Sequence, residues 1–448
     1  MIKLMRTAII KGGRFAMDKK ISRRTFLKIA GGALLLAGAG GVWYEQRALG
    51  RLASRVAGDV TGAIDASFVR QIVAADNQTA RTIMWQSAAA QKEAAVELRA
   101  EGGNVLRTFA AESAPYSDDG VSSYLQTARI DGLAPGTSYE YRLRDGKRAG
   151  EWQKLRADDG RTFSALVFPD SQSNDYSGWQ ELAHSAYERN PDTDFFINMG
   201  DLVDNGEDHR QWEAWFDAVA PLSANIPVAP IMGNHETYDQ NWKVRLPKAY
   251  LAQFAVPEVG SELFHRYYYS FDYGPAHFIV LNTQQDETND FHAGLLDEQQ
   301  AWFAEDIAAS KAKKTPWNIV LMHKDPIQYS FQSRPGRAEG FSDDGRAWMP
   351  LFDAHGVDLV LSAHLHTYRN RGHIRNFQRD AGGPLYIITG VAGNVRYPNL
   401  WKDHSLDEVV APQPEVDNYM TVKGDAQHIE IQSFQPDGSL IDTAKLEK

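Results

Sequence analysis

Five short apolar runs between residues 166 and 361 each end in polar residues, and this pattern constrains the fold most. The last run, 357–361, leads into His364 and His366. Short, mainly apolar runs are typical of buried strands in a parallel sheet. Because the carboxyl ends of parallel strands meet at one sheet edge, where open α/β folds bind ligands, we expect the terminal residues to lie together. They are Asp170, Gln172, Asp201, Asn234, His235, His323, His364 and His366.

Taken singly, each of these residues is a weak signal. A lone histidine at a strand end is more often a hydrogen-bonded structural residue, and Asn-His after glycine is often only a turn. Their recurrence at five successive strand ends is what favours a metal site. The chain contains no cysteine, so the ligands are expected to be carboxylate and amide oxygens and imidazole nitrogens.

Composition limits the other possibilities. The length of 448 residues is enough for two domains and a targeting segment. The formal net charge of -11 argues against general electrostatic attraction to nucleic acid or anionic lipid. We therefore expect no nucleic-acid partner.

Residues 1–45 have the pattern of an export signal. Arg23 and Arg24 precede a short apolar stretch from Ile29 to about Trp43 that is rich in glycine and alanine. This indicates a signal peptide rather than a spanning helix, although an amphipathic N-terminal helix is the alternative. The paired arginines resemble the twin-arginine signal. That resemblance implies recognition by the twin-arginine translocation machinery, a periplasmic or extracellular location, and no permanent membrane span once the signal is cleaved.

Residues 66–157 and 162–448 follow two different patterns. The first range has short alternating strands broken by turn residues, which predicts an all-β sandwich. The segment 130–139 resembles the turn and strand of fibronectin type III domains. The second range alternates strands with helices and predicts an α/β domain. Its expected helices are Trp179–Arg189, Gln211–Ala220, Asp297–Ser310 and Gly345–His355.

The order of the strand-end motifs resembles the calcineurin-like metallophosphoesterases over roughly residues 163–395. With the β-sandwich in front, the chain is similar to purple acid phosphatases. The resemblance implies a four-layer α/β/β/α domain and two divalent metal ions: manganese, zinc or iron. By motif, the first ion would be bound by Asp170, Gln172, Asp201 and His366, and the second by Asp201, Asn234, His323 and His364.

The same resemblance implies an exported hydrolase of small phosphate esters that uses a metal-bound hydroxide. His235 would donate a proton to the leaving group, although orienting its neighbours is an alternative role. Phosphomonoesters are the first expectation and phosphodiesters the alternative. A surface binding module with a vestigial site is a third hypothesis, of a different class.

Two residues depart from the family pattern. Gln172 stands where the family commonly has histidine, and Asp204 stands where purple enzymes carry a tyrosine ligand. The second departure puts ferric iron in doubt. Asp204 and Asn205 are therefore expected to be a ligand, an anchor behind the ligands or a turn cap. Arginine binds phosphate well, and the candidate substrate contacts are Arg334, Arg337, Tyr368 and Arg396.

Overall fold

The computed structural model describes residues 63–332 and 336–448, which belong to one compact unit. The expected signal segment at 1–45 lies outside the described residues. Among the helices of the described part, none combines the length and apolar character needed to span a membrane.

The N-terminal part consists of antiparallel strands, as predicted. One strand, β4, is shared by two sheets: residues 105–110 pair with β3 and residues 111–118 pair with β5. Trp85, Val96 and Tyr141 are buried together in the core between them. The likeness to fibronectin type III domains stays a prediction. The strands are β1 (Ser67–Ile72), β2 (Arg81–Ser87), β3 (Ala94–Ala100), β4 (Val105–Asp118), β5 (Val121–Ile130), β6 (Ser138–Asp145), β7 (Arg148–Ala149) and β8 (Gln153–Arg156).

The α/β part contains two larger sheets. In the first, β9, β10 and β11 are parallel, and β22 is antiparallel to β9. Its strands are β9 (Phe163–Phe168), β10 (Phe195–Asn198), β11 (Pro227–Pro230), β22 (Tyr419–Gly424), β23 (His428–Phe434) and β24 (Leu440–Glu447). The strand β1, which is antiparallel to β2 in the N-terminal part, also pairs with β11 of this sheet. The β1–β11 pair is parallel, and Ile72 lies opposite Val228. The N-terminal strands and this sheet therefore form one hydrogen-bonded path.

In the second sheet β13, β14, β17 and β20 are parallel. Its strands are β12 (Tyr269–Tyr273), β13 (Ala276–Leu281), β14 (Trp317–Met322), β17 (Leu359–Ser362), β20 (Leu385–Gly390), β18 (Thr367–Arg375) and β19 (Gln378–Arg379), with β21 (Val409–Val410) paired to β18. A separate ribbon is formed by β15 (Ile327–Gln328) and β16 (Gly340–Phe341). The strands β12 and β13 form an antiparallel hairpin across Gly274 and Pro275.

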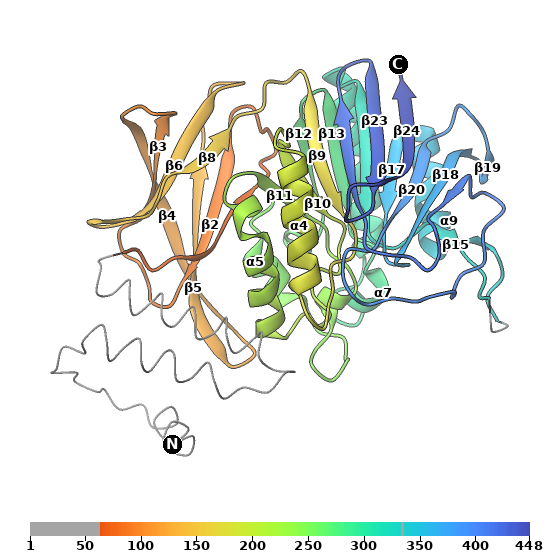
Figure 1. Cartoon of the computed structure of the whole chain (residues 1–448), viewed down its shortest axis with the longest axis horizontal. Helices are drawn as coiled ribbons and strands as arrows, with labels where there is room; N and C mark the ends of the chain where they lie inside the picture. Colours follow the sequence, from red (N-terminus) through yellow and green to blue (C-terminus); the bar gives the residue numbers. More distant parts are fainter. Residues whose placement is uncertain (1–62, 333–335) are drawn as a thin grey trace. The chain divides into compact units, whose positions relative to one another are not determined.

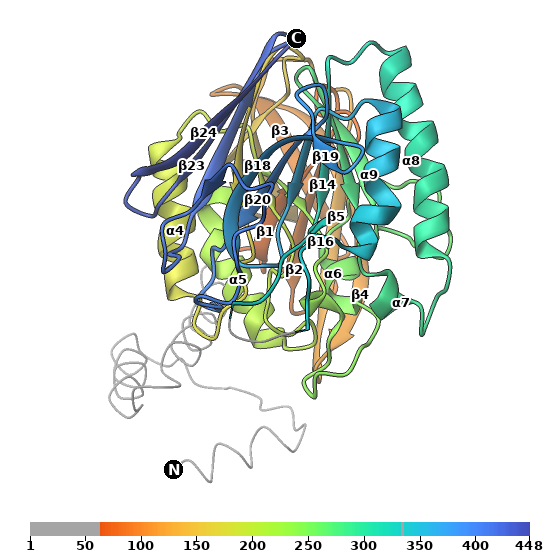
Figure 2. The same ribbon diagram turned by 90° about the vertical axis from the view of Figure 1, so that its right-hand side faces the viewer.

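The two sheets pack face to face, with helices on their outer sides (Figures 1 and 2). Aromatic contacts join the sheets: the ring centroids of Phe163 and Phe278 are 5.3 Å apart. Figure 2 shows α4 on one side of the sheets and α8 and α9 on the other. The expected four-layer architecture is confirmed. The helices are α4 (Ser177–Arg189), α5 (His209–Ser223), α6 (Lys248–Gln253), α7 (Gln285–Thr288), α8 (Leu295–Ala312), α9 (Asp343–His355) and the 3-10 turn η1 (His235–Thr237).

All four predicted helices are present as α4, α5, α8 and α9, and each begins two residues before its predicted start. In α9 the reason is its cap. The Ser342 side chain accepts a hydrogen bond of 3.0 Å from the Gly345 N–H, which satisfies one of the free amides of the first turn. Cap residues have no apolar periodicity, so a prediction from periodicity starts too late.

Candidate metal centre

The predicted ligands follow strand ends from both sheets of the α/β part. Asp170 and Asp201 follow β9 and β10, and Asn234 follows β11. His323 follows β14 of the second sheet, and His364 and His366 follow β17. The side chains meet where the two sets of carboxyl ends converge, and Asp170 and His323 are fully buried there. Parallel strand topology thus brings the residues together.

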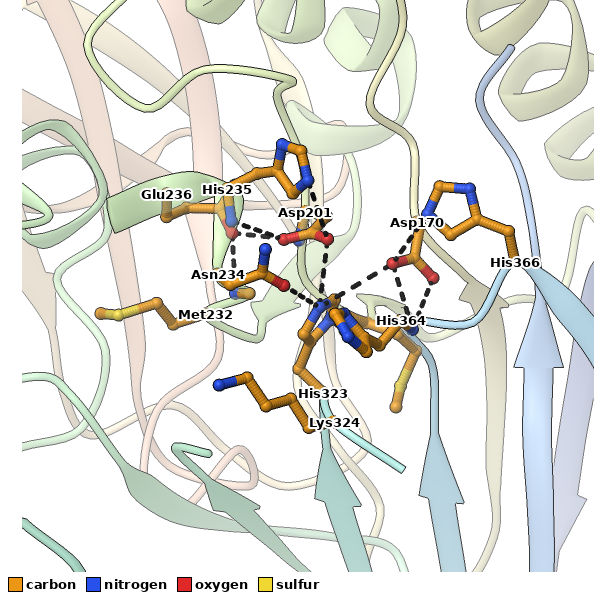
Figure 3. A network of polar contacts seen from close by, with 12 residues as sticks. Asp170, Asp201, Met232, Asn234, His235, Glu236, His323, Lys324, His364 and His366 are labelled. Atoms are coloured by element: carbon orange, nitrogen blue, oxygen red, sulfur yellow. Dashed lines mark hydrogen bonds and ion pairs between the residues drawn. The ribbon is translucent and has the colours of Figure 1, made fainter. Parts of the chain in front are cut away.

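Two groups of potential ligands share one carboxylate. Asp201, His323 and His364 have ligand atoms within 4.8 Å of one another, and so do Asp170, Asp201 and His366. Figure 3 shows dashed contacts running from His323 to Asp201, Asn234 and Asp170. The His323 Nε2 lies 3.1 Å from Asp201 Oδ2 and 3.2 Å from Asn234 Oδ1. This is an arrangement in which Asp201 can bridge two cations.

Hydrogen bonds to the backbone orient two of the imidazoles. The Nδ1–H of His323 donates to the Met199 carbonyl at 2.9 Å, and that of His366 donates to the Val395 carbonyl at 2.7 Å. The Nε2 of each ring then faces the carboxylates, and His366 Nε2 lies 3.6 Å from Asp170 Oδ1. Ligating histidines in proteins are commonly held this way, because the second nitrogen fixes tautomer and ring orientation.

Two further side chains have buried polar atoms without a hydrogen-bond partner within the described residues. They are the amide oxygen and nitrogen of Gln172 and the Nδ1 of His364. Leaving a buried polar atom unpaired costs about 1–3 kcal/mol, so native proteins rarely do it without a reason. Two cations, one coordinated by the Gln172 oxygen and the other by the His364 nitrogen, would supply that reason. The residues present therefore fit two divalent ions with oxygen and imidazole ligands.

The histidines of the site differ in the direction in which their surroundings shift the pKa. Burial lowers the pKa of His366 to about 4 and that of His364 well below its usual value, so both rings are neutral at pH 7, as metal ligation requires. Burial also lowers the pKa of His323, but the nearby Asp201 carboxylate outweighs it and raises that pKa to about 9. A cation at this place competes with a proton for the His323 nitrogen.

The backbone around the ligands is in a conformation that ordinary residues rarely adopt. Asp201, His364 and His366 have φ values of 47°, 72° and 51°. Such strain costs about 1–3 kcal/mol at each residue and is concentrated at functional sites. At the neighbouring Gly200, a Cβ atom would lie 2.4 Å from the His323 Nδ1. The turn after β10 therefore has no room for a side chain at Gly200.

Glu236 holds this turn in place through hydrogen bonds to its backbone. Its buried carboxylate accepts hydrogen bonds from the N–H groups of Asp201, Leu202 and Gly233 at 3.0, 2.8 and 2.7 Å. Charge-assisted bonds of this kind are stronger than bonds between neutral groups. The sequence pattern assigns no role to Glu236. In the structure it fixes the loop that presents the shared carboxylate.

His235 lies beside the two ligand groups without belonging to either. Its ring Nδ1–H donates to the Asp204 carbonyl at 2.7 Å, and its backbone N–H donates to Asp201 Oδ1 at 2.8 Å. The ring Nε2 is 4.0 Å from Asp201 Oδ2. Asp204 thus positions His235, with its carboxylate 3.6 Å from the same ring. Asn205 anchors the turn, because its side chain donates to the Asp239 carbonyl.

The predicted substrate contacts are not brought into the two ligand groups. The buried Tyr368 donates its hydroxyl to Asp442 at 2.8 Å. Arg396 forms an ion pair with Asp417 at 2.5 Å. Arg337 lies over the ring of Trp401 at 5.5 Å. Each of these side chains has a protein partner, and the fourth candidate, Arg334, lies outside the described residues.

Three aromatic residues near the site were missed. The rings of Tyr238 and Trp242 each lie 5.7 Å from the His235 ring. The ring of Tyr397 lies 4.9 Å from the His366 ring. All three are in irregular segments, where no periodicity or motif marks them. Only their short separation in sequence from His235 and Arg396 could have drawn attention to them.

Comparison with known families matches both parts of the chain. The family model described as calcineurin-like phosphoesterase matches residues 165–368. The model described as the N-terminal domain of purple acid phosphatase matches residues 68–157. The two matches correspond to the α/β part and the antiparallel part of the fold.

The individual proteins to which the chain is similar in sequence include acid phosphatases. The chain is 34% identical to purple acid phosphatase 23 of Arabidopsis thaliana, over 41% of this chain and 38% of that protein. It is 25% identical to acid phosphatase type 7 of Homo sapiens, over 79% of this chain and 82% of that protein. Purple acid phosphatases 13 and 15 of Arabidopsis thaliana are matched over 34% and 59% of their own length. The chain thus spans less than two thirds of these three plant relatives.

Among solved structures, a purple acid phosphatase from seeds of yellow lupin (Lupinus luteus) is similar in fold. The TM-score is 0.65 at 17% sequence identity, covering 85% of this chain and 74% of that chain. At this identity the similarity concerns the fold alone.

Proposed function

Because the chain combines a calcineurin-like phosphoesterase domain with a purple acid phosphatase N-terminal domain, we propose that it is a metal-dependent hydrolase of phosphate esters. The observation that carries this proposal is the position of Asp201, whose carboxylate belongs to both groups of potential ligands. One carboxylate shared between two sets of donors is the arrangement that a two-metal phosphoesterase needs.

We propose that the residues divide between two ions as the resemblance implies. The first ion would be held by Asp170, Gln172, Asp201 and His366, and the second by Asp201, Asn234, His323 and His364. When bound, such ions neutralise phosphoryl oxygens and lower the pKa of water. The oxygen-rich first set favours a hard divalent ion such as manganese.

His235 would act on the leaving group. Its Nδ1–H is held by the Asp204 carbonyl at 2.7 Å, so its Nε2 is the nitrogen left to face a substrate. A proton held at Nε2 would pass to the departing ester oxygen, which otherwise leaves as an unstable alkoxide. The Glu236 and Asp204 contacts keep the loop and ring in place. The chain's own residues thus position the substrate oxygen and supply a proton.

We propose that the substrates are phosphomonoesters. We also propose that the protein is exported by the twin-arginine route and acts in the periplasm or outside the cell. The Arg23-Arg24 pattern supports export, and phosphate scavenging outside the cytoplasm suits a monoesterase. A phosphodiesterase is the alternative on the same residues. A vestigial binding module is disfavoured because all seven predicted ligands and His235 are present.

The test is hydrolysis of p-nitrophenyl phosphate and bis-p-nitrophenyl phosphate by purified protein. The protein is first stripped with a chelator and then reconstituted with manganese, zinc or iron(II). We expect the monoester to be hydrolysed at least ~10-fold faster than the diester and an Asp201→Asn control to be inactive. The opposite preference would favour the diesterase. Failure on both esters with every metal would contradict the proposed function.

A further inference from the structure

Trp242 is an exposed aromatic residue in an unfavourable conformation. Its exposed fraction is 57%, and its φ of 61° is in the left-handed region. A bulky residue at positive φ is a genuine outlier, and exposing a large indole to water forgoes hydrophobic stabilisation. Strain of this kind persists where the surrounding structure enforces it, commonly at functional sites. Folding alone does not account for this residue.

Trp242 belongs to a wall of three rings, His235, Tyr238 and Trp242, beside the ligand groups. The His235 and Trp242 rings are nearly perpendicular, at 88°, with centroids 5.7 Å apart. Tyr238 lies 6.1 Å from Trp242. Because His235 is the proposed proton donor, the leaving group of a substrate must lie next to His235. The exposed indole, with its centroid 5.7 Å from that of the His235 ring, is then a large apolar surface that this leaving group can meet.

The loop holds Trp242 firmly. The Trp242 N–H donates to the Asp239 carbonyl at 2.9 Å, and the Asp239 carboxylate accepts from the Asn241 and Lys243 N–H groups at 2.7 and 2.9 Å. Isolated strand pairing between Tyr238 and Val244 closes the loop. A loop whose backbone is fixed before binding loses less entropy when a ligand arrives, which strengthens binding.

The N-terminal part braces the same loop through the β4–β5 hairpin. Asp118 accepts two hydrogen bonds, of 2.9 and 3.0 Å, from the Arg245 Nη2. Asp119 accepts one of 2.7 Å from the Gln240 side chain. The loop that carries Trp242 is thus supported on both sides of the tryptophan.

We propose that Trp242 is a specificity residue that stacks against a flat leaving group. The favoured substrates are then phosphate monoesters whose alcohol carries an aromatic or heteroaromatic ring, of which a nucleoside is one kind. This inference rests on the proposed function and adds the substrate class. A ring stacked on an aromatic side chain gains enough free energy to change specificity roughly tenfold or more.

The test compares adenosine 5′-monophosphate with ribose 5-phosphate. Both esters release a primary alkoxide, so the heteroaromatic base is the main difference that bears on stacking. We expect kcat/KM of the reconstituted enzyme to be roughly tenfold higher for the nucleotide. In Trp242→Ala this preference should disappear through a loss on the nucleotide, with ribose 5-phosphate changed less than about twofold. Trp242→Phe should retain part of the preference, because a ring is restored.

A matched control is Trp152→Ala. Trp152 packs against the guanidinium groups of Arg99 and Arg142 in the N-terminal sheets, at 3.9 and 4.6 Å, and its loss should leave the preference unchanged. Equal rates on both esters in the unaltered enzyme, or a preference that survives in Trp242→Ala, would overturn the inference and leave the proposed function standing. Absence of hydrolysis of every ester would overturn both.

Discussion

At the scale of single residues, four histidines around one site have different surroundings. His323 and His366 each use Nδ1–H to bind a backbone carbonyl and turn Nε2 toward the carboxylates. His364 has a buried Nδ1 with no hydrogen-bond partner within the described residues. His235 is bound to the Asp204 carbonyl and lies outside both ligand groups. These contacts support the proposal that three of the histidines are metal ligands and that the fourth is a proton donor.

His235→Ala should therefore separate metal binding from turnover. We expect the variant to keep both metal ions and to lose turnover ~10²–10⁴-fold, the usual contribution of a general acid. Elemental analysis and steady-state kinetics on the same preparation measure the two quantities. Glu298→Ala is a control for substitution away from the site. It removes the carboxylate that accepts a hydrogen bond from the Tyr268 hydroxyl. Loss of metal together with activity would place His235 among the ligands.

Most of the candidate ligands could be predicted from the sequence because each follows a buried strand. The strand Trp317–Met322 is buried throughout and apolar except for Asn318 and the indole nitrogen of Trp317, so the polar residue after it, His323, marks the edge of the sheet. Trp242 and Tyr397 could not be predicted in the same way. They come from irregular loops, and their closeness to His235 and His366 depends on tertiary contacts that leave no periodic pattern.

At the scale of elements, the β4–β5 hairpin and the loop 238–246 depend on each other. The Asp118–Arg245 pair is largely buried on the Asp118 side, and Arg245 also lies 3.5 Å from Glu207. Pairs with ideal geometry and partial burial contribute more than ordinary surface pairs. The N-terminal part therefore restrains the loop 238–246 of the α/β part.

Asp118→Asn should loosen that loop without unfolding the protein. We expect tryptic cleavage after Lys243 to become ~10-fold faster, because a charge-assisted hydrogen bond contributes about 1.5–3 kcal/mol. Asp131→Asn, which alters an exposed pair with Arg107 at 3.5 Å, should leave the cleavage rate unchanged. Mass spectrometry of timed digests identifies the site. Equal cleavage rates in both variants would show that the hairpin does not restrain the loop.

A second link between elements joins β13 to α8. His277 is hydrogen-bonded to Asp272 at 2.6 Å and to Asp306 at 2.8 Å, and Lys313 also pairs with Asp272. Burial alone would lower the pKa of His277, but the two carboxylates raise it to about 9 from its usual 6.5. The protonated ring is thus bound more tightly in the folded than in the unfolded chain.

This linkage makes stability depend on pH in a definite direction. The folded pKa lies above the unfolded one, so the stabilisation is complete below about pH 6.5 and is lost as pH rises through about 9. A change of this size corresponds to ~3 kcal/mol. Thermal unfolding with chelator present should show a larger fall between these pH values in the unaltered protein than in His277→Asn. An equal fall in both proteins would contradict the assignment.

At the scale of the whole molecule, the candidate metal centre joins the two sheets of the α/β part. Asp170, Asp201 and Asn234 come from the first sheet, and His323 and His364 come from the second. The sequence pattern indicated the strands and helices, but it did not divide the strands between two sheets or join β1 to β11. Strand order depends on pairing between distant segments, which local periodicity does not record.

The number of metal ions per chain tests the central claim most directly. The shared Asp201 carboxylate predicts two divalent ions per chain after reconstitution, and Asp201→Asn should lose occupancy at both positions because the substitution removes the charge that both ions use. Elemental analysis against protein concentration measures this in both proteins. A single ion per chain with full phosphatase activity, or two ions retained by Asp201→Asn, would contradict a centre bridged by Asp201.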